Sequence, residues 1–196
     1  MQALFDGYAN GFEDHLTQVL HYRAPDILVQ GLGARRFAQA LDLGCGTGLC
    51  GQRLRPICQR LTGVDLSANM VAQARARGVY DVVALADLLG YLAAPHDPCD
   101  LVIAADVMIY VGALDAVFAA VRNALVPGGV FAFTVELASG PEPLTLRSSL
   151  RYAHSRAGIE ALVRQNHLEF LGLAQHPIRE DQGVPIEGLF VWLVRP

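Results

Sequence analysis

Three aspartates stand where short apolar segments end, at Asp42, Asp65 and Asp87. If these segments are parallel strands of an open sheet, one ligand at their carboxyl ends could contact all three side chains. Asp65 lies 17 residues beyond Gly48, about where a carboxylate reaches the hydroxyls of a ribose. A carboxylate has two acceptor oxygens and so matches the two hydroxyls. Asp87 could accept a hydrogen bond from an adenine amino group. The spacing therefore predicts a nucleoside-containing ligand.

A glycine-rich segment follows the first of these strands, and residues 40–51 read ALDLGCGTGLCG. An apolar run that breaks into alternating glycines is typical of a buried strand ending in a tight turn, because glycine tolerates positive φ and close ligand approach. A helix starting after the turn would present backbone N–H groups to the ligand. The pattern Gly46-x-Gly48-x-x-Gly51 also fits the dinucleotide motif GxGxxG. Against a dinucleotide, Asp42 beside the loop would repel a pyrophosphate and suits a cationic ligand.

Composition limits the classes of function. The chain has 196 residues, of which 53% are apolar and 17% charged, so one domain with a packed core is expected over residues 1–196. A net charge of −4 without a dense basic run argues against nucleic-acid binding. All 15 basic residues are arginine, which excludes Schiff-base chemistry and a P-loop lysine.

The cysteines and histidines show no metal-site spacing, and the four cysteines form no disulfide framework. We therefore expect no metal, reduced thiols and a cytoplasmic location. No segment is apolar enough to span a membrane, and the N-terminus lacks a signal-peptide core, so no membrane partner is expected.

Strand and helix patterns alternate along most of the chain. Strands are expected before the glycine turn and over 60–65, 79–85, 100–105 and 130–135. Such alternation predicts right-handed crossovers and five parallel strands. Two further strands, 168–176 and 188–194, have no helix between them and predict a C-terminal antiparallel hairpin joined by a long loop over 177–187. This hairpin is foreign to the usual dinucleotide fold.

The N-terminal flank, residues 1–36, carries helical periodicity and no strand pattern. One interpretation is a helical flap that covers core surface. The other is a lid over the glycine turn, with Tyr8 reaching the ligand. Residues 37–196 would then form the core of the domain.

The sequence resembles the class I S-adenosylmethionine-dependent methyltransferases. The segments DLGCGTG, GVDLS, ALADL, DLVIAADVMIYVG and LVPGGVFAFTVE occur in the order typical of that family and cover roughly residues 38–137. The flanking segments LFDGYANGFEDHL and RYAHS resemble a bacterial subgroup that acts on small molecules. Some members of that subgroup follow tetratricopeptide repeats, so the sequence leaves open whether this chain is part of a longer protein.

The resemblance implies a Rossmann-like doubly wound fold and S-adenosylmethionine as cofactor, with S-adenosylhomocysteine as product. It implies that the backbone of the glycine turn surrounds the methionine part of the cofactor, with Asp42 close by. Asp65 would bind the ribose, and Asp87 with the Leu88 N–H would bind the adenine. A backbone carbonyl at Ala104 or Ala105 would meet the methionine ammonium, and Leu66 and Met70 could offer apolar faces to the base. The expected cofactor-binding residues are Tyr8, Asp42, Gly44, Cys45, Gly46, Gly48, Asp65, Leu66, Met70, Asp87, Leu88, Ala104 and Ala105.

Catalytic residues are harder to assign, because methyl transfer is an in-line displacement with an activated leaving group, so positioning can supply much of the rate. A general base is needed only if the acceptor must lose a proton. Tyr110 follows the fourth strand, where an acceptor would meet the methyl group, and it competes with a packing role. Glu136 and His154 are further pocket candidates, although His154 also suits a structural role. Weaker candidates are Asp106, Tyr152 and Arg179. Asp106 could instead cap the turn after the fourth strand. Arg179 is expected in a solvated loop, with anchoring of a substrate acid as the alternative.

The sequence therefore predicts methyl transfer to a small or medium-sized acceptor. The alternatives are a non-catalytic cofactor-binding or regulatory protein on the same fold, an NAD(P)-dependent oxidoreductase, and methylation of protein or RNA. The acidic net charge argues against RNA. The identity of the acceptor, the methylated atom, the use of a general base and the oligomeric state are not indicated.

Overall fold

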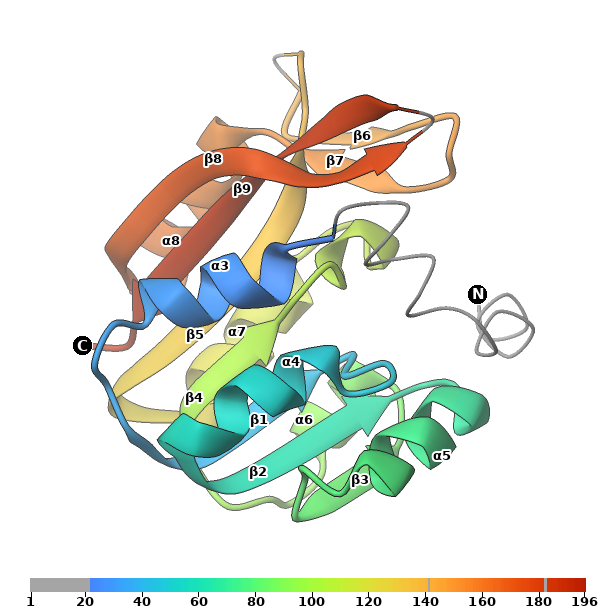
Figure 1. Cartoon of the computed structure of the whole chain (residues 1–196). Coiled ribbons are helices and arrows are strands. Elements are labelled where there is room, and N and C mark those ends of the chain that lie inside the picture. Colours follow the sequence, from blue (N-terminus) through green and yellow to red (C-terminus); the bar gives the residue numbers. More distant parts are fainter. Residues whose placement is uncertain (1–21, 141, 182) are drawn as a thin grey trace.

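The computed structural model of the chain describes residues 22–140, 142–181 and 183–196 (Figure 1). Tyr8 and the first predicted helix lie outside the described residues. The second helical stretch of the N-terminal flank is present as α3 (Ala24–Gly31), which begins at Ala24-Pro25. Proline is well tolerated there because the first turn of a helix does not use its N–H groups.

The central sheet has its five leading strands in the order β3-β2-β1-β4-β5, and each neighbouring pair is parallel. This confirms the predicted α/β fold. These strands are β1 (Phe37–Leu43), β2 (Cys58–Asp65), β3 (Val82–Leu85), β4 (Cys99–Ala104) and β5 (Leu125–Leu137). The order reverses between β1 and β4, and a ligand crevice is expected outside the carboxyl ends of the strands at this point.

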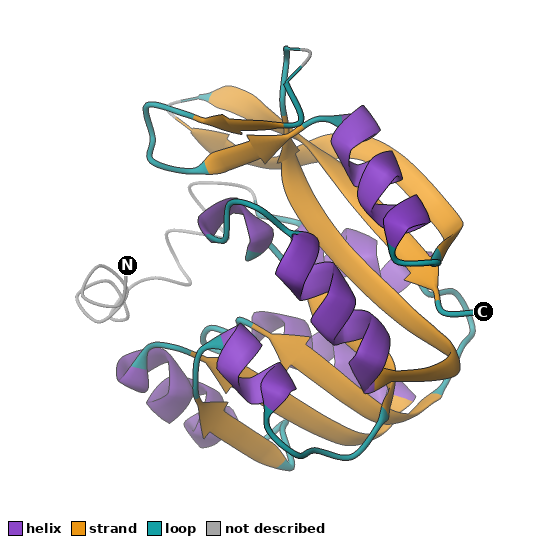
Figure 2. Cartoon of the chain, turned by 180° about the vertical axis from the view of Figure 1, so that it is seen from behind, coloured by secondary structure: helices purple, strands orange, loops and turns teal. Residues whose placement is uncertain are grey.

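Helices cover both faces of the sheet (Figures 1 and 2). On one face lie α3, α4 (Leu49–Leu54) with the 3-10 helix η2 (Arg55–Ile57), and α5 (Ala68–Arg77). On the other lie α6 (Leu88–Ala93), α7 (Asp115–Ala124) and α8 (Arg156–Gln165). Ser67 is the N-cap of α5, and its hydroxyl accepts from the Met70 N–H.

Alternation along the strands divides the apolar core into two main layers. On β4, Leu101 and Ile103 pack in the layer beneath α3 and α4, whereas Val102 and Ala104 pack with α7 and α8 on the opposite face. This is the pattern of a strand that is buried on both faces. Such a sheet gives the strand ends a rigid frame.

The tail is more extended than the sequence pattern predicts. β8 (Glu169–Asp181) and β9 (Val184–Val194) pair along nearly their whole length, and β9 also pairs antiparallel with β5. The antiparallel hairpin is confirmed, but the prediction of a long loop over 177–187 is wrong. Two prolines and several charged residues mask the strand pattern there, and the chain reverses at Gly183, whose φ is +76°. Proline is tolerated because this ribbon extends beyond the central sheet.

A short hairpin in the segment after β5 was not predicted. It consists of β6 (Leu144–Leu146) and β7 (Tyr152–His154), and β7 extends the sheet by pairing parallel with the end of β5. Strands of three residues are too short to show a period. Residues 127–129 lie within β5 as an irregular stretch, in which Gly128 has φ +79°.

Among the described helices, none is long and apolar enough to cross a membrane.

Candidate cofactor and acceptor site

The glycine turn joins β1 to α4 with backbone that only glycine adopts easily. Gly44, Gly46 and Gly48 have φ values of +64°, +53° and +95°. A Cβ at Gly44 would lie 2.4 Å from a methyl carbon of Val107, so close packing also requires glycine there. The Cys45 N–H donates to the Val64 carbonyl at 3.0 Å and the Gly48 N–H to the Cys45 carbonyl at 2.9 Å. These N–H groups hold the turn in place, and its glycines put no side chain between the backbone and a ligand.

Asp65 lies at the end of β2 and fastens the glycine turn. Its Oδ2 accepts from the Gly46 N–H and its Oδ1 from the Ser67 N–H, each at 2.9 Å. A carboxylate has about four acceptor positions, so both oxygens can accept further hydrogen bonds. The same side chain can therefore shape the turn and bind a diol.

Asp42 is a buried carboxyl group next to this turn, with 1% of its surface exposed. Burial raises the pKa of Asp42 to about 7; the hydrogen bond from Tyr80 opposes this shift, and the charge of Asp65 adds to it. The Tyr80 hydroxyl donates to Asp42 Oδ2 at 2.7 Å. Near neutral pH the group is poised between its two protonation states, and a nearby cation would favour the ionised one.

Tyr80 is a site residue that the sequence analysis missed. A Cβ on Gly51 would lie 2.3 Å from the Tyr80 ring, and one on Gly63 would lie 3.0 Å from it. Gly51 is the third glycine of the apparent dinucleotide motif. Its missing side chain leaves room for the Tyr80 ring, whose hydroxyl binds Asp42, and not for a pyrophosphate. Residues 79–81 were predicted as strand, but β3 begins at Val82. No local pattern indicates a contact between positions so far apart in sequence.

The predicted adenine-binding residues have structural roles of their own. The Asp87 carboxylate caps α6 by accepting from the Leu89 N–H at 3.2 Å and the Gly90 N–H at 2.6 Å. Leu66 is 43% exposed next to Asp65, whereas Met70 on α5 is almost wholly buried, so only Leu66 presents an open apolar surface. Leu88, the first residue of α6, is half-buried.

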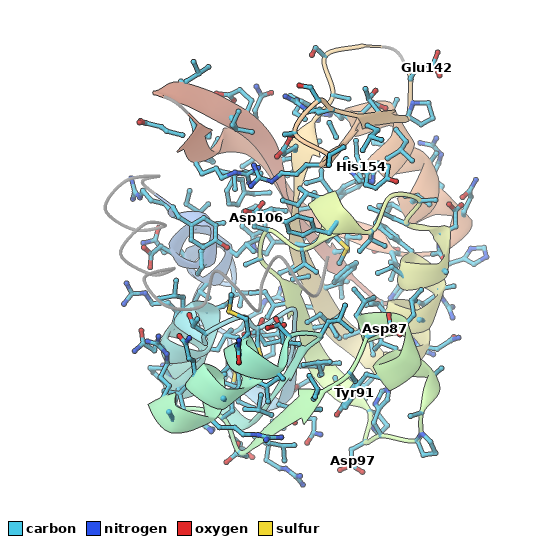
Figure 3. The ribbon with its side chains drawn as sticks, turned by 90° about the vertical axis from the view of Figure 1, so that its right-hand side faces the viewer. Asp87, Tyr91, Asp97, Asp106, Glu142 and His154 are labelled. Carbon is cyan, nitrogen blue, oxygen red and sulfur yellow. The ribbon has the colours of Figure 1, made fainter. Side chains whose placement is uncertain are left out.

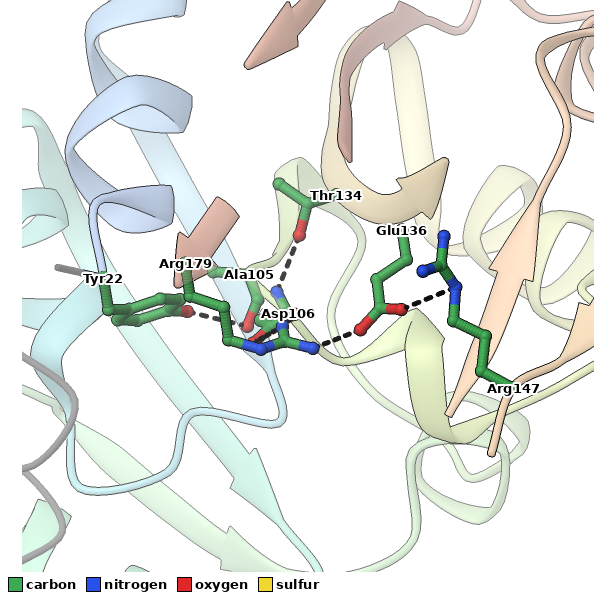
Figure 4. Close-up of polar contacts among 7 residues, drawn as sticks. All are labelled: Tyr22, Ala105, Asp106, Thr134, Glu136, Arg147 and Arg179. Carbon is green, nitrogen blue, oxygen red and sulfur yellow. Dashed lines mark hydrogen bonds and ion pairs between the residues drawn. The ribbon is translucent and has the colours of Figure 1, made fainter. Parts of the chain in front are cut away.

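The end of β4 is contacted by the N-terminal flank. The Tyr22 hydroxyl donates to the Ala105 carbonyl at 3.3 Å (Figure 4). Ala104 is fully buried, so Ala105 is the more accessible of the two predicted carbonyl positions. Residues just before α3 therefore reach this edge of the sheet.

A buried network of ion pairs lies beyond the end of β4 (Figure 4). Arg179 Nη1 donates to both oxygens of Asp106, each at 2.8 Å, and its Nη2 donates to Glu136 Oε1. Arg147 Nε pairs with the other Glu136 oxygen at 3.2 Å. Arg179 and Glu136 are each only 2% exposed, so the prediction of a solvated Arg179 is wrong. The residue lies in β8, where the buried carboxylate of Glu136 and the partly buried one of Asp106 compensate its charge.

Asp106 is held in a strained conformation. Its φ is +59°, a region that costs an L-residue roughly 1–2 kcal/mol. Its N–H donates to Thr134 Oγ1 at 2.8 Å, and its carboxylate is bound by Arg179. The expectation that Asp106 could cap a turn is replaced by this role in the ion-pair network. Strain of this kind persists where surrounding contacts enforce it, often in functional sites.

The three pocket candidates Tyr110, Glu136 and His154 do not lie together on one face of the sheet. Tyr110, in the 3-10 helix η3 (Met108–Tyr110), is close enough to Asp106 and Arg179 for their charges to shift its pKa, although burial is the main cause of the upward shift. Glu136 and His154 point to opposite faces of the sheet, because His154 pairs in register with Leu137. Figure 3 shows Asp87 well separated from Asp106 and His154.

His154 is fastened to the loop that follows η3. Its Nε2 lies 2.8 Å from the Gly112 carbonyl, which can only accept, so Nε2 carries the proton. Burial lowers the pKa of His154. Its neighbour on β7, Tyr152, packs its ring 3.3 Å from where a Cβ on Gly112 would lie. Both residues support the loop, as the structural interpretation of His154 predicts.

A glycine turn between β1 and α4, with acids at the ends of β1 and β2, defines an α/β protein that binds a nucleoside-type cofactor. Residues 40–129 match the model of a family described as "Methyltransferase domain". Over 186 residues the chain is 31% identical to malonyl-[acyl-carrier protein] O-methyltransferase of Salmonella typhimurium, covering 94% of this chain and 71% of that protein. The chain belongs to the class I S-adenosylmethionine-dependent methyltransferases, and S-adenosylmethionine is its methyl donor.

Solved structures share the fold. The N-methyltransferase NodS from Bradyrhizobium japonicum, in complex with S-adenosylhomocysteine, has a TM-score of 0.71 at 22% identity and covers 89% of this chain and 86% of its own. A methyltransferase structure that includes the Haloferax volcanii Trm112 activator has a TM-score of 0.77 at 19% identity, covering 98% and 97%. The terminal hairpin that argued against a dinucleotide fold is thus part of an architecture found in methyltransferases.

Proposed function

We propose that this protein transfers the methyl group of S-adenosylmethionine to a small or medium-sized acceptor in the cytoplasm. The observation that carries the proposal is the pairing of a buried, protonatable Asp42 with a positive-φ glycine turn fastened to Asp65. A cation near Asp42 and a diol near Asp65 are what these two carboxyl groups can recognise. The four buried free cysteines support a reducing location.

These residues fit the cofactor by their chemistry. When bound, S-adenosylmethionine supplies a methyl group on a positively charged sulfur. Asp42 would balance the positive charges of the methionine part, and Asp65 would accept from the ribose hydroxyls. Leu66 would offer an apolar face to the base, and the Ala105 carbonyl would accept from the ammonium. Asp87 and the Leu88 N–H are proposed to read the adenine.

On the acceptor side, the described residues support orientation more than proton removal. Both carboxylates that could serve as a base, Asp106 and Glu136, are bound by arginines, and His154 lies on the other face of the sheet. A proton from the acceptor would have to compete with these guanidinium groups for the same carboxylate oxygens. Tyr110 and the arginine network would then position an acceptor whose reacting atom already carries a free lone pair.

The N-terminal flank is proposed to cover this site. The hydrogen bond from Tyr22 to Ala105 supports the lid over the alternative of a flap that only covers the core. The relative from Salmonella typhimurium is named for malonyl-[acyl-carrier protein], a carrier-bound acid, which supports an acceptor of modest size.

The test is release of S-adenosylhomocysteine from S-adenosylmethionine in the presence of a fractionated bacterial metabolite extract. We expect release that depends on both a fraction and the protein, and that is lost in Asp65→Ala. Arg164→Gln, at an exposed position of α8, is the matched control and should stay active. Binding of S-adenosylhomocysteine without turnover on any fraction would instead support a non-catalytic, cofactor-binding protein.

A further inference from the structure

Arg77, the last residue of α5, reaches the glycine turn. Its Nε donates to the Thr47 carbonyl at 2.8 Å, across 30 positions of the sequence. Its side chain also packs over Gly48, because a Cβ on Gly48 would lie 3.1 Å from Arg77 Cδ and 3.2 Å from Arg77 Nε. Gly48 has φ +95°, so its conformation favours glycine as well. The arginine therefore contacts two successive residues of the turn.

Thr47 is the residue of the turn that this hydrogen bond anchors. Its side chain is buried, and its hydroxyl finds no hydrogen-bond partner within the described part of the chain. The preceding residue is fastened differently, because the Gly46 N–H donates to the carboxylate of Asp65. The orientation of Thr47 between two glycines of positive φ therefore depends on the guanidinium of Arg77.

The link from α5 to β3 supports the same turn at a second point. Gly78 follows Arg77 as the C-cap of α5, with φ +69°, and lets the chain turn away from the helix. Tyr80 lies in this link and donates to Asp42 beside the turn. Its ring would also lie 3.1 Å from a Cβ on Gly48. Residues 77–80 thus hold the turn although they are not part of its strand–turn–helix motif.

Arg75 shows what a purely structural arginine of α5 looks like. Both arginines lie in the last turn of the helix, where a positive charge favours the helix C-terminus. Arg75 Nη2 donates to the Val83 carbonyl of β3, also at 2.8 Å. The two side chains make equivalent hydrogen bonds, but the bond of Arg75 goes to a strand and that of Arg77 to the glycine turn. Comparing them separates support of the fold from support of the cofactor site.

We propose that Arg77 is a positioning residue for the methyl donor. By holding Thr47 and Gly48, it fixes in advance the conformation in which the turn receives the methionine part of S-adenosylmethionine, and this lowers the ordering cost of binding. Arg77 acts through the backbone of the turn. The proposal rests on the proposed function and adds to it a residue outside the glycine motif that sets the affinity for the cofactor.

The test measures the binding of two ligands to the full chain by calorimetry. One is S-adenosylhomocysteine, and the other is methylthioadenosine, which keeps the adenosine and the sulfur but lacks the amino and carboxyl groups. Arg77→Met keeps aliphatic packing over Gly48 and removes the N–H donor. It should weaken S-adenosylhomocysteine by about tenfold, the scale of one hydrogen bond from a charged donor, and methylthioadenosine by less than about twofold.

Two further variants serve as controls. Arg77→Lys should recover part of the lost affinity for S-adenosylhomocysteine, because it restores a charged donor without the planar geometry of arginine. Arg75→Met should bind both ligands as the wild-type protein does. A cooperative transition in urea shows that each variant is folded, and Arg77→Gln provides the same comparison if Arg77→Met does not fold.

The outcomes separate this proposal from the proposed function. Unchanged affinity of Arg77→Met for S-adenosylhomocysteine, or equal weakening of both ligands, would overturn the positioning role and leave the methyl donor assigned. An equal loss of affinity in Arg75→Met would overturn it too, because the effect would then come from α5 as a whole. Failure of the wild-type protein to bind S-adenosylhomocysteine would refute the proposed function first.

Discussion

Replacing Asp42 by asparagine should remove a pH dependence of cofactor binding between pH 6 and pH 8. Burial raises the pKa of this carboxyl group to about 7 in the protein without ligand. At pH 6 it is mostly protonated, and a cationic ligand must first displace the proton. Affinity should therefore rise with pH through about 7 and level off above it.

The size of the effect follows from the ionised fraction of Asp42. With a pKa of about 7, that fraction rises from about one tenth at pH 6 to about nine tenths at pH 8. The dissociation constant should fall by about tenfold, or about 1.4 kcal/mol, if only the ionised form binds. The Tyr80 hydrogen bond favours the carboxylate and already limits the rise of the Asp42 pKa to about 7, so its removal in Tyr80→Phe should move this range upward in pH.

Calorimetry with S-adenosylmethionine and S-adenosylhomocysteine provides the assay, at several pH values and in two buffers of different ionisation enthalpy. Below pH 7 the wild-type protein should release close to one proton on binding, whereas Asp42→Asn should release fewer. The amino group of the ligand titrates identically with both proteins, so the difference between them is the informative quantity. A wild-type affinity that changes no more with pH than that of Asp42→Asn would refute the reasoning.

Stability without ligand gives a second measure of the same carboxyl group. Its pKa is higher in the folded chain (about 7) than the ordinary value of 3.8, so the folded state binds the extra proton between these limits. The free energy of unfolding should therefore fall as pH rises from about 4 to about 7, and this fall should be smaller in Asp42→Asn. Urea unfolding across this range measures both slopes. Parallel slopes would contradict the raised pKa.

Two further substitutions test the packing around the site. Arg179→Met leaves Asp106 without its ion-pair partner and leaves Glu136 with Arg147 alone. It should lower the free energy of unfolding by about 3–5 kcal/mol in urea titrations, and a loss below about 1 kcal/mol would contradict the ion-pair network. Gly51→Ala places a Cβ 2.3 Å from the Tyr80 ring and should weaken both stability and cofactor binding, whereas Gly140→Ala, where a Cβ meets no atom within 4 Å, should be silent. Equal effects of the two alanines would exclude the proposed role of Tyr80.

The parallel sheet was predictable because its central strands carry short apolar runs that are buried on both faces, as over residues 101–104 of β4. The glycine turn and the acids beside it were predictable for a related reason. A run of glycines, which indicates positive φ, and an acid at the end of an apolar segment are local features. Both can be recognised in a single sequence. These features are also the ones that identify the methyl donor.

The acceptor side could not be predicted, because its contacts join distant segments. Arg179 is buried only because Asp106 and Glu136 meet it from the ends of two other strands. Taken alone, its neighbourhood of prolines and charged residues is typical of a solvated loop. Tyr80 is a similar case, since its ring is explained only by glycines from two other elements. Ion pairs and close packing between residues far apart in the chain produce no periodic pattern in the sequence.

The most direct test of the account is calorimetry of the wild-type chain with S-adenosylhomocysteine and, separately, with NAD(P)H. We predict saturable binding of S-adenosylhomocysteine that is lost in Asp65→Ala while the variant stays folded, and no binding of the dinucleotide. Binding of the dinucleotide alone, or near-unchanged affinity of Asp65→Ala for S-adenosylhomocysteine, would contradict the assignment of the ribose to Asp65 and of this cofactor to the glycine turn.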